Sequence, residues 1–176
     1  MATASHAPAH LPPLGSHERG EIGIQLQETL VDLADLALVG KQLHWCIVGP
    51  GFMPLHRHLD ELVDSWHGLS DAVAERAVAL GEFPDGQASA IAAHDGYRNI
   101  ARGPIEDHAV VAELVRRLAE VDEKTRTRMD RLGEIDAASQ DVLVDVVRAL
   151  EEQLWMLRSH MPLSGRPAAD GASPRA

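Results

Sequence analysis

The sequence predicts an all-α protein with one domain: a bundle of four long helices, with a short extra helix in the crossover between the second and the third. The chain has 176 residues, enough for one domain of ordinary size. Hydrophobic residues make up 45% of it but aromatic residues only 3%. This composition favours packed helices over a sheet built on aromatic and β-branched pairs. Four long segments also repeat apolar residues at helical spacing.

The first two predicted helices form a hairpin. The first begins at about Glu18, and the Gly-Pro-Gly sequence of residues 49–51 ends it because these residues are typical of turns. The second begins after Phe52 and runs to about Leu80, where the turn-forming residues 81–86 follow. The helical spacing of the first segment is carried by Ile22, Leu26, Leu30, Leu33, Ala37 and Leu38.

A long crossover leads to the third predicted helix. The crossover shows little periodicity, and we expect one short helix in it at about residues 88–94. The third helix starts near Pro104 and runs to about Arg131. Glu106 and Asp107 would lie in its first turn, where carboxylates interact favourably with the helix dipole.

The fourth predicted helix starts near Ser139, a good N-cap residue, and ends before Pro162. Its apolar face is formed by Leu143, Val146, Val147, Leu150, Leu154 and Leu157. Two helical hairpins joined by a long crossover are typical of the ferritin-like bundle.

The two ends of the chain differ in composition from the part between them. Residues 1–16 and 162–176 are rich in proline and alanine and lack periodicity, so we expect mobile tails around a folded domain at residues 17–161. No segment has the pattern of a secretory signal or a membrane span. The single cysteine, Cys46, excludes an intrachain disulfide and fits a reducing compartment. We therefore expect a cytoplasmic protein without a membrane partner.

Six polar side chains share one face of the second predicted helix. At about 100° per residue they fall within an arc of roughly 100°, and they are His56, Asp60, Asp64, His67, Asp71 and Glu75. A solvated acidic face is the alternative interpretation, but it does not explain the two imidazoles. Carboxylates and imidazoles together suit iron and related ions. For His67 an extra ligand, a proton relay and a surface residue remain open.

One chain cannot close a metal site from this face. Asp60 and Asp71 are 11 positions apart, roughly 16 Å along a helix. A two-fold partner with its second helix antiparallel would bring His56 and Asp60 of one chain to Asp71 and Glu75 of the other, which makes two equivalent sites per dimer. His44, at the end of the first helix, is a candidate third ligand beside His56; a hydrogen-bonded core histidine is the alternative.

Several segments resemble the signature of the Dps family, the DNA-binding proteins from starved cells. They are residues 41–45 (KQLHW), 55–61 (LHRHLDE) and 71–76 (DAVAER), and residues 152–157 (EQLWML) resemble the last helix of that family. The resemblance extends from about residue 18 to residue 160. It implies a ferroxidase centre between subunits, formed by His44, His56, Asp60, Asp71 and Glu75. Larger ferritins use Glu-x-x-His motifs, and this chain has none.

The resemblance also implies a miniferritin that assembles as a dodecamer of two-fold dimers, oxidises ferrous iron with hydrogen peroxide in preference to dioxygen, and stores ferric mineral against oxidative stress. Zinc is an alternative occupant of the site. Acidic pores for iron would be lined by Glu134, Asp136 and Asp141 near the last turn. Trp45, beside His44, would either intercept oxidising equivalents or pack in the core. Cys46 stands where the family usually has asparagine.

The charge balance argues against DNA as a partner at neutral pH. The chain has 16 Lys and Arg residues against 27 Asp and Glu residues, for a formal charge of −11. This charge attracts cations and repels phosphate backbones. His6, His10 and His17 would add positive charge in acid, so DNA association at lower pH stays open. The alternative function is a structural, nucleoid-associated protein that protects DNA and has a non-catalytic metal site.

Overall fold

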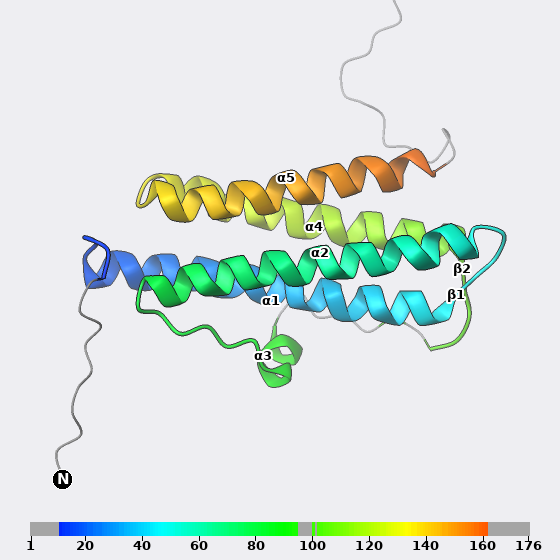
Figure 1. Cartoon of the computed structure of the whole chain (residues 1–176), viewed down its shortest axis with the longest axis horizontal. Helices are drawn as coiled ribbons and strands as arrows, with labels where there is room; N and C mark the ends of the chain where they lie inside the picture. The colour runs from blue at the N-terminus through cyan, green and yellow to red at the C-terminus, as the bar shows by residue number, and fades with distance from the viewer. Residues whose placement is uncertain (1–10, 95–99, 101, 162–176) are drawn as a thin grey trace, which may run out of the picture.

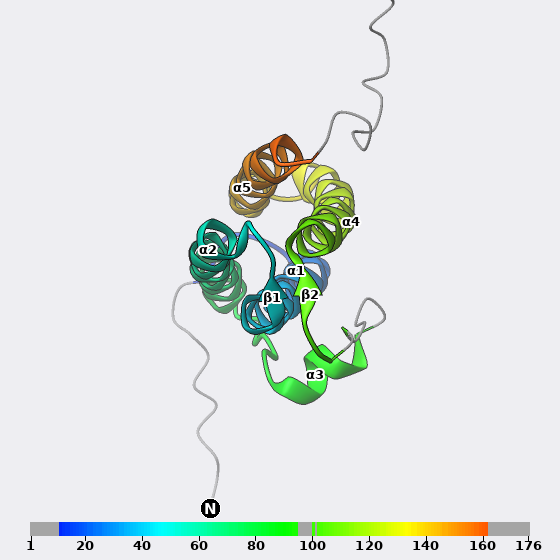
Figure 2. The ribbon, with the colours of Figure 1, turned by 90° about the vertical axis from the view of Figure 1, so that its right-hand side faces the viewer.

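The structure is a computed structural model that describes residues 11–94, 100 and 102–161. Four long helices form two antiparallel hairpins that pack side by side, and this confirms the predicted ferritin-like bundle (Figure 1). The helices of the first hairpin are α1 (Ser16–Cys46) and α2 (Phe52–Ala79), and those of the second are α4 (Asp107–Gly133) and α5 (Ala137–Ser159). The short helix α3 (Ala88–Ala93) lies beside α1 on the side away from α5 (Figure 2).

A fully buried tryptophan joins three of the four helices in the core. Trp66 of α2 packs against α1 at Gly40, where a Cβ atom would lie only 2.6 Å from a carbon of the Trp66 ring. A glycine is therefore needed at this position for the two helices to approach so closely. On the other side, Trp66 Nε1 donates a hydrogen bond of 2.8 Å to Gln153 Oε1 of α5. The buried indole N–H thus has a partner, as buried polar groups require.

Charged side chains are also buried, between α1 and α4. Arg128 Nη1 of α4 lies 2.7 Å from Asp32 Oδ2 of α1, and both residues are less than a tenth exposed. A second pair uses residues 3 positions farther along α1 and 11 positions earlier in α4, where Arg117 Nη1 lies 3.3 Å from Asp35 Oδ2. Burial raises the pKa of Asp35, and the positive charge of Arg117 opposes this rise. The second pair of helices is therefore held to the first by ion pairs as well as by apolar contacts.

The start of the third long helix differs from the prediction. Ile47–Val48 (β1) and Ile105–Glu106 (β2) form a short parallel pair, with Ile47 opposite Ile105, which no pattern in the sequence predicted. Because residues 105–106 are extended in this pair, α4 begins at Asp107 and not near Pro104. Gly51 N donates a 2.6 Å hydrogen bond to Asp107 Oδ2, which ties the turn between α1 and α2 to the start of α4.

The last helix also begins earlier than predicted. Its N-cap is Asp136, whose Oδ2 accepts a hydrogen bond of 2.9 Å from the backbone N–H of Ser139, and the helix starts at Ala137. Ser139 is therefore inside the first turn and is not the cap. Arg76, near the end of α2, donates to Asp136 Oδ2 at 2.6 Å and to Ser139 Oγ at 2.9 Å. The α4–α5 turn is thereby joined to the first hairpin.

Of the two predicted tails, residues 1–10 and 162–176 lie outside the described residues. The rest of the N-terminal segment lies against the bundle: Leu14 is partly buried against the core, and Arg19 donates a hydrogen bond to its carbonyl oxygen. Leu11 contacts Gly81, in the turn after α2. Within the described residues, no helix is both long and apolar enough to cross a membrane.

Candidate metal centre

Two predicted ligands, His44 and His56, form a stacked pair. His44 lies in the last turn of α1 and His56 in the second turn of α2, and the turn at residues 49–51 folds one helix back on the other. The ring centroids are 3.7 Å apart, with an angle of 21° between the ring planes. His44 is buried and His56 half-buried. The structure therefore brings together two imidazoles that are 12 positions apart in the sequence.

Reciprocal hydrogen bonds orient both rings. His44 Nδ1 lies 2.9 Å from the carbonyl oxygen of His56, and His56 Nδ1 lies 3.0 Å from the carbonyl oxygen of His44. A carbonyl oxygen can only accept, so in each pair Nδ1 is the donor and carries the proton. In the neutral ring, Nε2 is then the nitrogen with a free lone pair. Fixing the tautomer from the far side of the ring in this way is typical of histidines that bind metal.

Asp60 lies beside this pair and is held by Lys41. Lys41 Nζ donates a 2.6 Å hydrogen bond to Asp60 Oδ1, and the same oxygen lies 3.4 Å from His44 Nδ1. The hydrogen bond from Lys41 holds the pKa of the Asp60 carboxyl below its ordinary value, with a further contribution from the nearby imidazoles. Asp60 is therefore ionised at neutral pH, as a metal ligand must be. His44, His56 and Asp60 are therefore neighbours in the structure, and their role as metal ligands remains a prediction.

Asp71 and Glu75 lie elsewhere in the subunit. Both are exposed on α2, which continues without interruption from Phe52 to Ala79. The 11 positions from Asp60 to Asp71 correspond to roughly 16 Å of helix, too far for one ion. Neither side chain has a hydrogen bond or ion pair with the described part of the chain. Their role as ligands remains a prediction that requires a second subunit.

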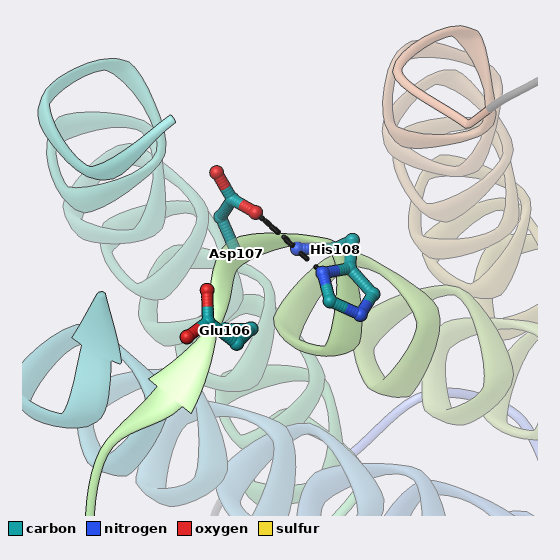
Figure 3. A group of neighbouring side chains, drawn as sticks. All are labelled: Glu106, Asp107 and His108. Carbon is teal, nitrogen blue, oxygen red and sulfur yellow. Dashed lines mark hydrogen bonds and ion pairs between the residues drawn. The ribbon is translucent and has the colours of Figure 1, made fainter. Parts of the chain in front are cut away.

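A second group of possible ligands was not singled out in the sequence. Glu106, Asp107 and His108 have ligand atoms within 4.8 Å of one another at the start of α4 (Figure 3). Asp107, however, accepts hydrogen bonds from Gly51 N at 2.6 Å and from His108 N at 2.7 Å. These bonds explain its position by the geometry of the helix start. Three consecutive polar residues were the only signal in the sequence.

The predicted pore residues differ in their surroundings. Glu134 and Asp141 are exposed on either side of the α4–α5 turn. Asp136 between them is half-buried, and its carboxylate is bonded to Arg76 and to Ser139 in the first turn of α5. Burial opposes ionisation of Asp136, but the hydrogen bonds from Ser139 and Arg76 prevail and hold its pKa below the ordinary value. A pore formed by several subunits is untested by one chain, and all three assignments remain predictions.

Trp45 and Cys46 follow His44 at the end of α1. The side chain of Trp45 is 70% exposed, so it is not part of the core of the subunit. Of the two interpretations of Trp45, packing inside one chain is therefore wrong. Cys46 is half-buried, and its Sγ accepts a hydrogen bond of 3.1 Å from Gln42 Nε2.

Comparisons with known proteins agree with this fold. Residues 24–163 match the family described as the Ferritin-like domain. The DNA protection during starvation protein of Mycolicibacterium smegmatis is 33% identical over 158 residues, which cover 88% of this chain and 85% of the relative.

Two solved structures show the same arrangement of helices. The Mycobacterium smegmatis Dps structure in its tetragonal form superposes with a TM-score of 0.84 at 31% identity, covering 90% of this chain and 97% of that one. DpsA14 from Streptomyces coelicolor superposes with a TM-score of 0.83 at 31% identity, covering 90% and 95% of the two chains. The fold, the matched residues and the level of identity together show that this chain belongs to the Dps family of ferritin-like proteins.

Proposed function

We propose that the protein is a ferroxidase and iron store that binds ferrous iron between two subunits. The observation that carries this proposal is the orientation of His44 and His56: hydrogen bonds to backbone carbonyls hold both rings with Nε2 available as a ligand. An ionised carboxylate, Asp60, lies beside them. Imidazole and carboxylate donors are the set that binds ferrous iron in related non-haem sites.

The second half of the site would come from a partner subunit. Asp71 and Glu75 lie one turn apart on the exposed face of α2, without intrachain partners among the described residues. An antiparallel two-fold contact between two α2 helices places these carboxylates opposite His56 and Asp60 of the other chain, twice per dimer. Dimers of this kind would assemble further into a hollow dodecamer, in which the ferric product collects.

The reaction is a two-electron reduction of the oxidant. Two ferrous ions give one electron each, and hydrogen peroxide with two protons becomes two molecules of water. Delivery of both electrons together avoids the hydroxyl radical that a single electron would release, which would protect the cell against oxidative damage. Dioxygen is the second oxidant, and a reducing cytoplasm would supply the ferrous iron. The net charge of −11 per chain attracts the cation to the protein.

Lys41 opposes the binding of ferrous iron to Asp60. Lys41 Nζ lies 2.6 Å from Asp60 Oδ1 and forms an ion pair with it. A ferrous ion that binds Asp60 must therefore compete with this internal cation. The ion has the advantage of several donors at once, whereas Lys41 has one hydrogen bond. Zinc would meet the same donors and would occupy the site without being oxidised.

Protection of DNA is the second candidate function, and it rests on the name of the Mycolicibacterium smegmatis relative. The charge of this chain opposes direct binding at neutral pH, because affinity for DNA comes from Lys and Arg residues that neutralise phosphates. Removal of ferrous iron and peroxide would protect DNA without any contact. A gel-shift measurement at neutral and mildly acidic pH distinguishes contact from chemical protection.

The test of the ferroxidase is anaerobic loading with ferrous iron, followed by hydrogen peroxide, with the ferric absorbance recorded. We expect rapid formation of soluble ferric cores by the wild type and a rate near that of a protein-free control for His44→Ala/Asp71→Ala. The matched control is Asp145→Ala/His160→Ala, which removes the same two residue types from exposed positions on and beside α5. A wild type that does no better than the protein-free control, while assembled, would refute the proposal.

A further inference from the structure

The exposed face of α2 carries its polar residues symmetrically about the middle of the helix. The midpoint between His56 and Glu75 is the same as that between Asp60 and Asp71, and it falls between Ser65 and Trp66. Asp64 and His67 are also at equal distances from this point, as are Met53 and Val78. An antiparallel contact about a two-fold axis through this midpoint therefore pairs each position with its counterpart.

Asp64 and His67, the two polar residues of this face nearest to the midpoint, lack partners among the described residues. Asp64 and His67 are both exposed, and neither has a hydrogen bond or ion pair with the described part of the chain. Farther out, Met53 is 53% exposed and Val78 is 50% exposed. Apolar side chains at both ends with complementary polar groups at the centre form a surface that can pack against a copy of itself.

We propose that, in the antiparallel α2 contact between two copies of this chain, Asp64 accepts a hydrogen bond from His67 of the partner subunit across the two-fold axis. The register of this contact rests on the proposed function, because it places the two halves of the iron site opposite each other. The imidazole has an N–H to donate in either protonation state. Two such pairs are formed, since each subunit contributes one Asp64 and one His67.

Charge complementarity supports a second copy as the occupant. Asp60, Asp64, Asp71 and Glu75 put four carboxylates from each subunit on this face. Before iron binds, carboxylates facing one another across an interface would repel. His67 is the group that faces Asp64 in this register, so that the centre of the contact contains hydrogen-bonded pairs and not opposed carboxylates. His67 thus acts as a positioning residue, which sets the register of the dimer without binding iron.

A charge-swap cycle tests the contact. We would compare the wild type with His67→Asp, Asp64→His and the double swap Asp64→His/His67→Asp, all without iron and with a chelator present. Sedimentation velocity over a dilution series gives the amounts of monomer, dimer and larger assemblies, and circular dichroism checks that each variant is folded. The control is His58→Asp, because His58 is paired with Glu61 of its own helix at 3.0 Å and the same three-residue spacing.

We expect His67→Asp to weaken association about tenfold, Asp64→His by less, and the double swap to restore most of the loss, since it returns one acid and one imidazole to each pair. His58→Asp should leave association unchanged. If His67→Asp also leaves it unchanged, His67 is a solvated surface residue and the inference fails. If the double swap loses as much as the two single variants combined, the two residues are not in contact and the inference also fails.

The outcome is separable from that of the proposed function. Association is measured without iron, whereas the ferroxidase is measured with the native residues 64 and 67 in place. If association follows the charge-swap pattern but the protein does not oxidise iron, the Asp64–His67 contact is supported and the proposed ferroxidase function is refuted. If the protein oxidises iron but its association does not change with the substitutions at residues 64 and 67, only the Asp64–His67 contact is refuted.

Discussion

The charged residues between α1 and α4 have partners within the chain, whereas three carboxylates on the exposed face of α2 have none among the described residues. Asp32 and Arg128 are almost completely buried, and their charged atoms are 2.7 Å apart. Lys124 and Glu120 add a further ion pair at the edge of the same region. On α2, by contrast, Asp64, Asp71 and Glu75 have no hydrogen bond or ion pair with residues that the structure describes.

Solvation explains this difference. A charge that leaves water on folding must be paired, because its desolvation costs several kcal/mol. A charge on an exposed helix face keeps its water and costs little in the monomer. It can therefore remain without a partner until a cation or a second subunit arrives. Pairing of buried charges inside the chain thus marks residues that hold the subunit together, whereas exposed carboxylates without such a pair are available for binding.

The largest effect expected from this comparison is that of Arg128→Met. The variant leaves Asp32 buried without its closest partner, so we expect a loss of about 3 kcal/mol in the free energy of unfolding. Urea denaturation followed by circular dichroism measures it. Lys124 lies 3.6 Å from Asp32 and can compensate in part. A loss below about 1 kcal/mol, within the usual range of a surface substitution, would mean that pairing within the chain does not mark structural residues.

Asp71→Asn should leave the free energy of unfolding nearly unchanged and weaken metal binding instead. Because Asp71 is exposed and unpaired within the described subunit, the free energy of unfolding should change by less than about 0.5 kcal/mol. The affinity for Co²⁺, a non-oxidised substitute for ferrous iron, should fall at least about tenfold because a charged ligand is lost. Absorbance titration of the assembled protein measures this, with Asp145→Asn as the control. Unchanged affinity would remove Asp71 from the site.

Asp136, a predicted pore residue, is also paired within the chain with Arg76 and Ser139, and Asp136→Ala tests what this pairing contributes to stability. Loss of the N-cap of α5 should cost about 1 kcal/mol. Since the pKa of Asp136 is lowered in the folded protein, its contribution is present above the pKa of the unfolded chain and is lost as the pH falls through the folded value. The wild type and the variant should therefore begin to converge in stability as the pH falls below about 4, and the difference should vanish below the lowered pKa of Asp136. Parallel stability curves across that range would contradict the assignment.

The smallest effect should be that of Lys41→Met. Without the competing ammonium, Co²⁺ should bind about threefold more tightly at neutral pH, in keeping with the small energy of a half-exposed ion pair. The pKa of Asp60 should rise towards its ordinary value, and Lys41→Arg should behave like the wild type. Weaker binding by Lys41→Met would show that Lys41 orients Asp60 for the metal and does not compete with it.

Most of the bundle was predictable from the sequence because helical periodicity is a local property. The apolar spacing in α1 and the turn at residues 49–51 gave the first hairpin its correct limits to within a few residues. The starts of α4 and α5 were predicted less well. Both depend on contacts with distant segments: α4 on the pairing of Ile105 with Ile47, and α5 on Arg76.

The sequence by itself determined which side chains share the exposed face of α2, because the angle between residues on a helix is fixed by backbone geometry. It also showed that a single chain cannot close the site, since helical rise sets the separation of Asp60 and Asp71. Only the tertiary structure decided that His44 and His56 orient each other through their backbone carbonyl oxygens. The same is true of the hydrogen bond from Lys41 to Asp60. These contacts join two helices, and their geometry depends on how closely α1 and α2 approach, which residue spacing does not specify.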